Sequence, residues 1–212
     1  YKIANKKEDA WLAVIGCIGD NFLPDFANEF IENYPNLWKQ NAKTAFDAYY
    51  KTDIGKITKI LNFALKDKTS NVVKMFKIMM NAKAPEEIFE ENNSMMHRYK
   101  QIDKKYQKLI EKAKKQAKEK LLFFEYAGNL SLSGDLANEL SYLYQDKIIV
   151  VCYVKGNKVN ISIRGKKARE LTAKAIDGLE GATGGGHEHA TGAKIRSEDI
   201  REFKKRVVEL TK

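Results

Sequence analysis

The sequence predicts a mixed α+β or α/β protein: a helical N-terminal lobe, a long connector helix and a small domain built on a mixed sheet. Apolar residues recur at helical spacing over the first part of the chain. Further along, β-branched runs alternate with turn residues and helical patterns. The chain has 212 residues, 43% of them hydrophobic, enough for a substantial core. We expect the lobe over 1–84, the connector over 85–120 and the sheet domain over 121–212.

The helical lobe is predicted from short apolar segments that end at glycine or proline. The first segment is almost wholly apolar and stops at Gly19, with Pro24 soon after, which is a helix-ending pattern. Pro35 closes the second segment. The later segments carry an apolar stripe at steps of three and four. The predicted helices cover 8–18, 26–34, 36–51, 53–65 and 70–80.

The connector is predicted as one helix that begins at Pro85, with two glutamates in its first turn. One narrow stripe is apolar and the other faces are charged. The alternative is a helix that is interrupted at 92–94, where the sequence reads Asn-Asn-Ser. Residues 98–120 hold ten basic and three acidic side chains. This surplus indicates either a solvated helix face or contact with a nucleic-acid backbone. The stripe consists of Tyr99, Ile102, Tyr106, Ile110, Ala113, Ala117 and Leu121.

The C-terminal domain is predicted from a change of pattern after residue 120. Hydrophobic and β-branched runs indicate strands, and Gly156-Asn157 between two of them indicates a hairpin turn. Ser197, followed by two acidic residues, is expected to cap the last helix. Strands are predicted over 121–127, 147–155 and 159–164, helices over 133–144, 166–179 and 197–211, and a glycine loop followed by a short helix or strand through 195.

The composition favours a polyanionic partner. The formal net charge is +10, which suits a nucleic acid first and an acidic membrane surface second, although a lysine-rich solvated surface gives the same count. No apolar run approaches the ~18 residues of a membrane span, so we expect no membrane insertion. Cys17 and Cys152 lie in separate apolar runs, and we interpret both as reduced core thiols of a cytoplasmic protein. The chain starts at Tyr1, which suggests a fragment or processed product.

The segment Gly184-Gly185-Gly186-His187 is the strongest functional signal in the sequence. Consecutive glycines are used where φ is positive or where a ligand approaches the main chain closely. An imidazole beside exposed backbone N–H groups predicts an anion site, above all for phosphate. His189, two residues on, is either structural or a further substrate contact.

Two other positions carry chemistry that fits such a site. Ser162 and Arg164 alternate on one face of a predicted strand, and a guanidinium recognises phosphate with paired hydrogen bonds. Arg164 could equally be an exposed residue at the end of a strand. Asp20 follows a buried apolar helix and is either a turn residue or a metal ligand.

These residues resemble a known family. The pattern Gly184-Gly185-Gly186-His187-x-x-Ala190-x-Gly192 is similar to the signature of the DHHA1 domain, the C-terminal half of DHH phosphoesterases. The run 159–164 looks like the Ser-x-Arg strand of that family, and the form of the motif is closest to the archaeal RecJ-like branch. The segment 13–20 resembles the end of the catalytic DHH domain, where the last aspartate reaches a two-manganese site. The other DHH motifs do not occur in this sequence.

The resemblance implies a Mn²⁺-dependent (or Mg²⁺-dependent) exonuclease acting on single-stranded DNA or RNA. Asp20 would be one metal ligand, and the other ligands would lie on an N-terminal DHH-domain chain. Ser162, Arg164, His187, His189 and the amides of 184–186 would hold substrate phosphate, with His187 acting in catalysis. Alone, the chain is expected to be inactive. Two alternatives are a non-catalytic scaffold that accompanies replication proteins, and an oligoribonuclease or cyclic-dinucleotide phosphodiesterase.

Overall fold

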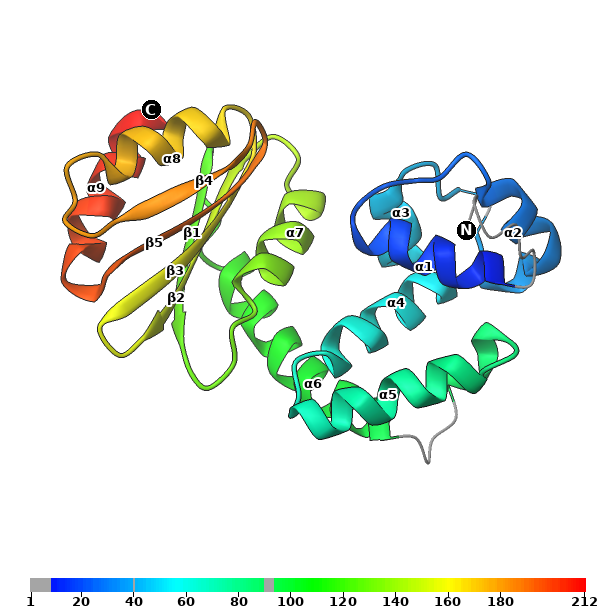
Figure 1. Ribbon diagram of the computed structural model, residues 1–212. Helices are drawn as coiled ribbons and strands as arrows, with labels where there is room; N and C mark the ends of the chain where they lie inside the picture. The colour runs from blue at the N-terminus through cyan, green and yellow to red at the C-terminus, as the bar shows by residue number, and fades with distance from the viewer. Residues whose placement is uncertain (1–8, 40, 90–93) are drawn as a thin grey trace. The chain divides into compact units, whose positions relative to one another are not determined.

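The computed structural model of the chain describes residues 9–39, 41–89 and 94–212. They divide into two compact units, Tyr1–Lys104 and Lys105–Lys212 (Figure 1). The first unit is helical in all its described regular structure, and the second holds a five-stranded mixed sheet with helices. The predicted fold class, mixed α+β, is therefore confirmed.

The first unit is built around α4, whose apolar face is buried along its whole length. Ile54, Ile57 and Ile60 are completely buried and pack in one cluster with Trp11 and Phe30 from the earlier helices. Spacings of three along α4 place these side chains on one side of the helix. The helices of this unit are α1 (Ala10–Gly19), α2 (Ala27–Asn33), α3 (Ala45–Lys51), α4 (Asp53–Ala64) and α5 (Thr69–Asn81), with 3₁₀ turns at Pro35–Leu37 and Pro85–Phe89.

The helix predicted over 36–51 is wrong in its first part, because only Ala45–Lys51 is α-helical. The helix begins where Thr44 forms a capping box. The Thr44 hydroxyl accepts a hydrogen bond from the Asp47 N–H (3.0 Å), and the Asp47 carboxylate accepts one from the Thr44 N–H (3.2 Å). These bonds satisfy two N–H groups that the helix itself leaves unpaired.

The α-helix predicted for the connector is shorter than expected, and its predicted start, Pro85–Phe89, is a 3₁₀ turn. The α-helix α6 covers Ser94–Lys114 and crosses the boundary between the two units. Of the possible break at 92–94, residues 92 and 93 lie outside the described residues, and Ser94 is the first residue of α6. At its C-terminal end, the prediction of helix to residue 120 is wrong, because Ala117 forms a bridge with Leu122 and the chain turns into the sheet. The apolar stripe is confirmed for Ile102, Tyr106, Ile110 and Ala113, which are buried.

The second unit is a sheet with the strand order β1-β2-β3-β5-β4. β1 and β2 are parallel and are connected through α7, whereas all other neighbours are antiparallel. Figure 1 shows α7 on one face of the sheet and α8 with α9 on the other. The elements are β1 (Leu121–Ala127), α7 (Ser133–Leu143), β2 (Ile148–Lys155), β3 (Lys158–Arg164), α8 (Ala168–Ile176), β4 (Thr183–His187), β5 (Ala190–Arg196) and α9 (Ile200–Leu210).

The two faces of β3 separate apolar from polar side chains. Val159, Ile161 and Ile163 are buried in the core that α8 and α9 cover, together with Phe203 of α9. Asn160, Ser162 and Arg164 alternate with them and are only half-buried. The structure thus places the polar side chains of β3 on the side of the sheet opposite α8.

Two predictions near the C-terminus are wrong. The glycines at 184–186 lie in the strand β4 and not in a loop. Of the two alternatives for the segment through 195, the strand is confirmed, as β5. Glycines carry no side chains, so a strand made of them leaves no alternating hydrophobic pattern. Ser197 does not cap the last helix through its side chain; it begins a 3₁₀ turn, Ser197–Asp199, and α9 starts at Ile200.

Candidate functional site

The register of β3, β5 and β4 aligns the predicted site residues in rows that run across the sheet. In the first row, Arg164 pairs with Ala190, and Ala190 pairs with His187. In the second row, Ser162 pairs with Gly192, and Gly192 pairs with Gly185. Two residues separate the rows along each strand, so both belong to the same face. We call these the first row and the second row.

Arg164 is held in place by neighbours on three elements. Its Nε donates to the side-chain oxygen of Asn138 on α7 at 2.7 Å. Its Nη1 donates to the carbonyl of Ile163 at 2.8 Å and to that of Thr191 on β5 at 3.2 Å. The bond to Thr191 directs the guanidinium toward β5, the strand that lies between Arg164 and His187 in the sheet. A guanidinium fixed in this manner loses little further freedom when it binds an anion.

Ser162 lies where α7 begins. Its hydroxyl donates to the hydroxyl of Ser133, the first residue of α7, at 3.0 Å. α7 packs against β2 and β3, whereas α8 packs against β4 and β5 on the opposite face. Across the second row, from β3 to β4, the half-buried Ser162 is followed by Gly192 and Gly185, both of which are exposed.

The three consecutive glycines differ in what the fold requires of them. A Cβ on Gly184 would lie 2.9 Å from Ile176 Cδ1, so α8 packs directly on that position. Gly186 has φ +140°, and a Cβ there would lie 2.6 Å from the Ala190 carbonyl oxygen. Around Gly185, apart from its neighbours in the chain, no atom of the described residues lies within 4 Å of the Cβ position. Packing and backbone conformation thus explain two of the glycines and leave Gly185 without a structural reason.

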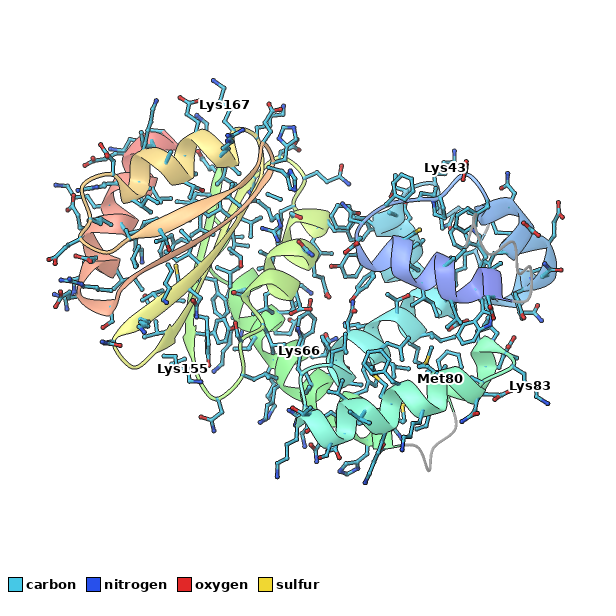
Figure 2. The ribbon with its side chains drawn as sticks, viewed as in Figure 1. Lys43, Lys66, Met80, Lys83, Lys155 and Lys167 are labelled. Carbon is cyan, nitrogen blue, oxygen red and sulfur yellow. The ribbon has the colours of Figure 1, made fainter. Side chains whose placement is uncertain are left out.

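The turn Glu188–His189 joins β4 to β5 and is fixed to the beginning of α8. The Gly165 N–H donates to the His189 carbonyl at 3.1 Å, and the Arg169 N–H donates to the Glu188 carbonyl at 3.3 Å. The side chains of His187 and His189 are exposed. Figure 2 labels Lys167 beside this end of the sheet and Lys155 at the opposite end. The main-chain carbonyl of His189, and not its exposed side chain, holds the turn in place.

The glycine segment does not form the anion-binding loop that the sequence predicted. A strand alternates its N–H groups between two sides, so successive amides cannot point at one spot. β4 is the last strand in the sheet order, and only β5 pairs with it among the described strands. Backbone groups on the other edge of β4 are thus left for water or a ligand.

Asp20 belongs to the first unit, at the end of α1. It is exposed, and its N–H donates to the carbonyls of Gly16 (3.2 Å) and Cys17 (3.1 Å). Asn21 follows in the left-handed region with φ 58°, which turns the chain away from the helix. Burial, and then the charge of Asp20, raise the pKa of the Cys17 thiol. Cys17 is half-buried and not a core residue, whereas Cys152 is buried.

The described residues do not themselves form a metal centre. Residues 9–39, 41–89 and 94–212 contain no group of three or more His, Cys, Asp or Glu side chains placed to hold a metal ion. A single carboxylate such as that of Asp20 supplies at most two of the six oxygen ligands of Mg²⁺. Within the same ranges, the structure contains no helix with the length and apolar character that a membrane crossing needs.

Sequence reasoning missed several residues that shape this face. Asn138 and Ser133, both on α7, hold Arg164 and Ser162. They are far from the motifs in sequence, and no local pattern singles them out. Gly192, which the family signature already included, lies opposite Gly185, a pairing that the sequence did not predict.

A family model described as the DHHA1 domain matches residues 120–212. The match covers the second unit from its first strand onward, where the motifs predicted a DHHA1 domain. A search among curated proteins found no match.

Solved structures share the fold of nearly the whole chain. RecJ from Thermus thermophilus in complex with Mg²⁺ is 16% identical, with 97% of this chain and 34% of that one covered and a TM-score of 0.61. Exonuclease RecJ bound to manganese is 18% identical, with 97% and 55% covered and a TM-score of 0.59. The pGpG-specific phosphodiesterase PggH from Vibrio cholerae is 15% identical, with 86% and 66% covered and a TM-score of 0.51. This chain thus spans between a third and two thirds of their lengths.

Proposed function

We propose that the DHHA1 domain of this chain binds the phosphodiester backbone of a single-stranded nucleic acid, as the substrate-binding part of a RecJ-like nuclease. The observation that carries the proposal is the alignment of the first and second rows. Arg164 and His187 are the two ends of the first row. The second row ends at Gly185, an exposed glycine that the fold does not require.

The chemistry of the first row suits one phosphate group. Arg164 and His187 are two strand spacings apart, or about 10 Å between their Cα atoms at ~4.8 Å per spacing. The guanidinium already extends over β5 toward the space between them. A guanidinium and an imidazole N–H are both strong donors to phosphate oxygens. A backbone lying between these side chains would next pass Gly185, where the missing side chain permits close approach.

A binding measurement tests this assignment. The full chain is titrated with fluorescein-labelled oligo(dT) and oligo(U) of matched length, and anisotropy is recorded. We expect Arg164→Ala and His187→Ala each to weaken binding by roughly 10-fold or more, because each removes a charge-assisted bond of about 1.5–3 kcal/mol. Arg201→Ala is the matched control, since Arg201 is exposed on α9, a helix of the opposite face. Equal affinity of all variants would refute the proposal.

The metal chemistry of a RecJ-like nuclease would come from outside the described residues. We assign Asp20 as one prospective ligand of a Mn²⁺ or Mg²⁺ centre, whose other ligands would be supplied by a polypeptide that carries the DHH motifs. The residues of this chain bind and orient the strand, and His187 donates to the phosphate beside the bond that is cleaved. The GGHxHAxGA form of the motif favours the archaeal RecJ-like branch within the family.

A cleavage assay separates the alternatives. Labelled single-stranded DNA and the dinucleotide pGpG are incubated with Mn²⁺ and the chain, with and without a separately expressed DHH-domain chain from the same organism. We expect cleavage of the long strand only in the mixture. Binding without cleavage in both arms would instead indicate a replication scaffold. Preferential cleavage of pGpG would indicate a dinucleotide phosphodiesterase.

A further inference from the structure

The face that carries the first two rows continues into a third. Asn160 pairs with Lys194, and Lys194 pairs with Thr183, two residues further along each strand. We call this the third row. By the alternation of side chains, it belongs to the same face as Arg164 and His187. Lys194 and Thr183 are exposed, and Asn160 is half-buried.

We propose that the nucleic-acid strand runs along β5 from the first row to the third, and that Lys194 is a second electrostatic anchor for its backbone. This rests on the function proposed above and extends the site to a residue outside the glycine motif. Successive rows are about 6.8 Å apart, at ~3.4 Å per residue of an antiparallel strand. One extended nucleotide of a single strand can span that separation, so three rows accommodate three consecutive phosphates.

The electrostatics of the third row favour an anion. Among the residues that the structure describes, no acidic side chain forms an ion pair with Lys194 or with Lys158, which lies two residues beyond the row on β3. The alternating positions of β3, β5 and β4 that form the three rows hold no carboxylate. An ammonium without a counter-ion on an exposed strand is available to a phosphate at little desolvation cost.

We call this path along β5 the track. At its far end, beyond the third row, the positive charge is already balanced by acidic side chains. Arg196 pairs with Glu180 at 2.7 Å and with Glu198 at 3.4 Å, so its guanidinium is already neutralised. Next to it lies an open pocket of ≈ 450 Å³, lined by Lys158, Thr183 and Lys194 among others. The pocket has the size of a small-molecule site and is large enough for one nucleotide. We therefore expect the track to end at this pocket.

The test compares a short and a long ligand. The probes are labelled pdTpdT, whose two phosphates reach the first two rows, and labelled dT8, which covers all three. We expect Lys194→Gln to weaken dT8 binding roughly fivefold and to leave pdTpdT binding unchanged. The slope of log K against log salt for dT8 should fall by about 0.7, the loss of one phosphate contact on a single strand. Lys205→Gln, an exposed lysine on α9, is the matched control.

The outcomes distinguish this inference from the proposed function. If Lys194→Gln binds dT8 with the affinity and salt slope of the unchanged chain, while Arg164→Ala binds weakly, the track is refuted and the function stands. If Lys194→Gln weakens both probes equally, the assigned order of the rows is wrong. If the unchanged chain binds neither probe, the proposed function fails and the track fails with it. A thermal melt of each variant confirms that it is folded.

Discussion

At the scale of single residues, the second unit separates glycines that the fold needs from one that it does not. Gly184 lies against α8, and Gly186 has a positive φ next to the Ala190 carbonyl. Gly185 has open space where a side chain would be. A glycine inside a strand weakens the fold by roughly 0.5–1 kcal/mol relative to alanine. With glycine at position 185, the fold is therefore less stable than it would be with alanine, and packing is not improved.

This contrast gives a prediction for two adjacent substitutions. Gly185→Ala should leave the free energy of unfolding unchanged or raise it by up to about 1 kcal/mol, while it weakens oligo(dT) binding. Gly186→Ala should lower the free energy of unfolding by about 1–3 kcal/mol, because alanine is strained at that φ. Urea denaturation gives the first quantity and anisotropy the second. A Gly185→Ala variant that is destabilised like Gly186→Ala would show that the glycine has a structural role.

At the scale of elements, the short helix α3 depends on its cap. It has seven residues, too few to be stable in isolation, and its first N–H groups are paired by Thr44 and Asp47. The cap therefore determines where the helix starts as well as how stable it is.

Removing the cap should be measurable. Thr44→Ala is expected to lower the free energy of unfolding by about 1 kcal/mol, the usual effect of losing an N-cap side chain. Ser70→Ala is a suitable control, because Ser70 is exposed in the first turn of α5. Both variants are compared by urea denaturation. Equal effects of the two substitutions would contradict the role given to Thr44.

The start of α5 supplies a dependence on pH. The backbone N–H of Lys68, 2.7 Å from the Asp67 carboxylate, is the largest of the contributions that lower the pKa of Asp67, and the Asn71 amide and Arg98 lower it further. Because the folded-state pKa lies below the unfolded one, Asp67 stabilises the fold above its ordinary pKa of about 4. That contribution is lost as the pH falls through the lowered value. We expect acidification below about pH 4 to destabilise Asp67→Asn less than the unchanged chain, as measured by thermal melts across this range.

Elements could be predicted from sequence where their own side chains determine them. The strand predicted over 121–127 has the bounds of β1, because its run of large apolar residues fills the core. β4 could not be recognised, since its three glycines carry no pattern and its strand conformation comes from pairing with β5 and from α8 above Gly184. The end of α6 at Lys114 is likewise set by the bridge from Ala117 to Leu122, a contact outside the helix.

The candidate site, too, could be predicted only in part from the sequence. Local chemistry and then the family resemblance predicted Ser162, Arg164 and His187, and the register places them in adjacent rows of a face that Lys194 shares. Asn138, which fixes Arg164, depends on the packing of α7 and has no signal in sequence.

At the scale of the whole molecule, the chain carries a formal charge of +10, and its described residues lack a metal-binding cluster. The surplus of positive charge fits the proposed binding of a polyanion. Binding of oligo(dT) should accordingly weaken steeply with added salt.

The lack of a metal cluster among the described residues predicts how the chain responds to Mn²⁺. A ligand that binds only the folded state raises its stability, whereas one that does not bind has no effect. We expect the melting temperature to be the same with Mn²⁺ and with a chelator, and Asp20→Asn to melt like the unchanged chain. A Mn²⁺-dependent increase that Asp20→Asn abolishes would contradict this and reveal a metal site within the chain itself.

The position of β4 has a consequence for the motion of the molecule. It lies at the edge of the described sheet, three of its five residues are glycine, and only β5 pairs with it there. Glycines lose more conformational freedom on ordering than other residues, so β4 should detach at a lower free energy than the central strands. Its amide protons would then exchange with solvent faster than those of β2. A nucleic-acid strand bound along β5 and contacting His187 of β4 would hold this edge closed and slow that exchange.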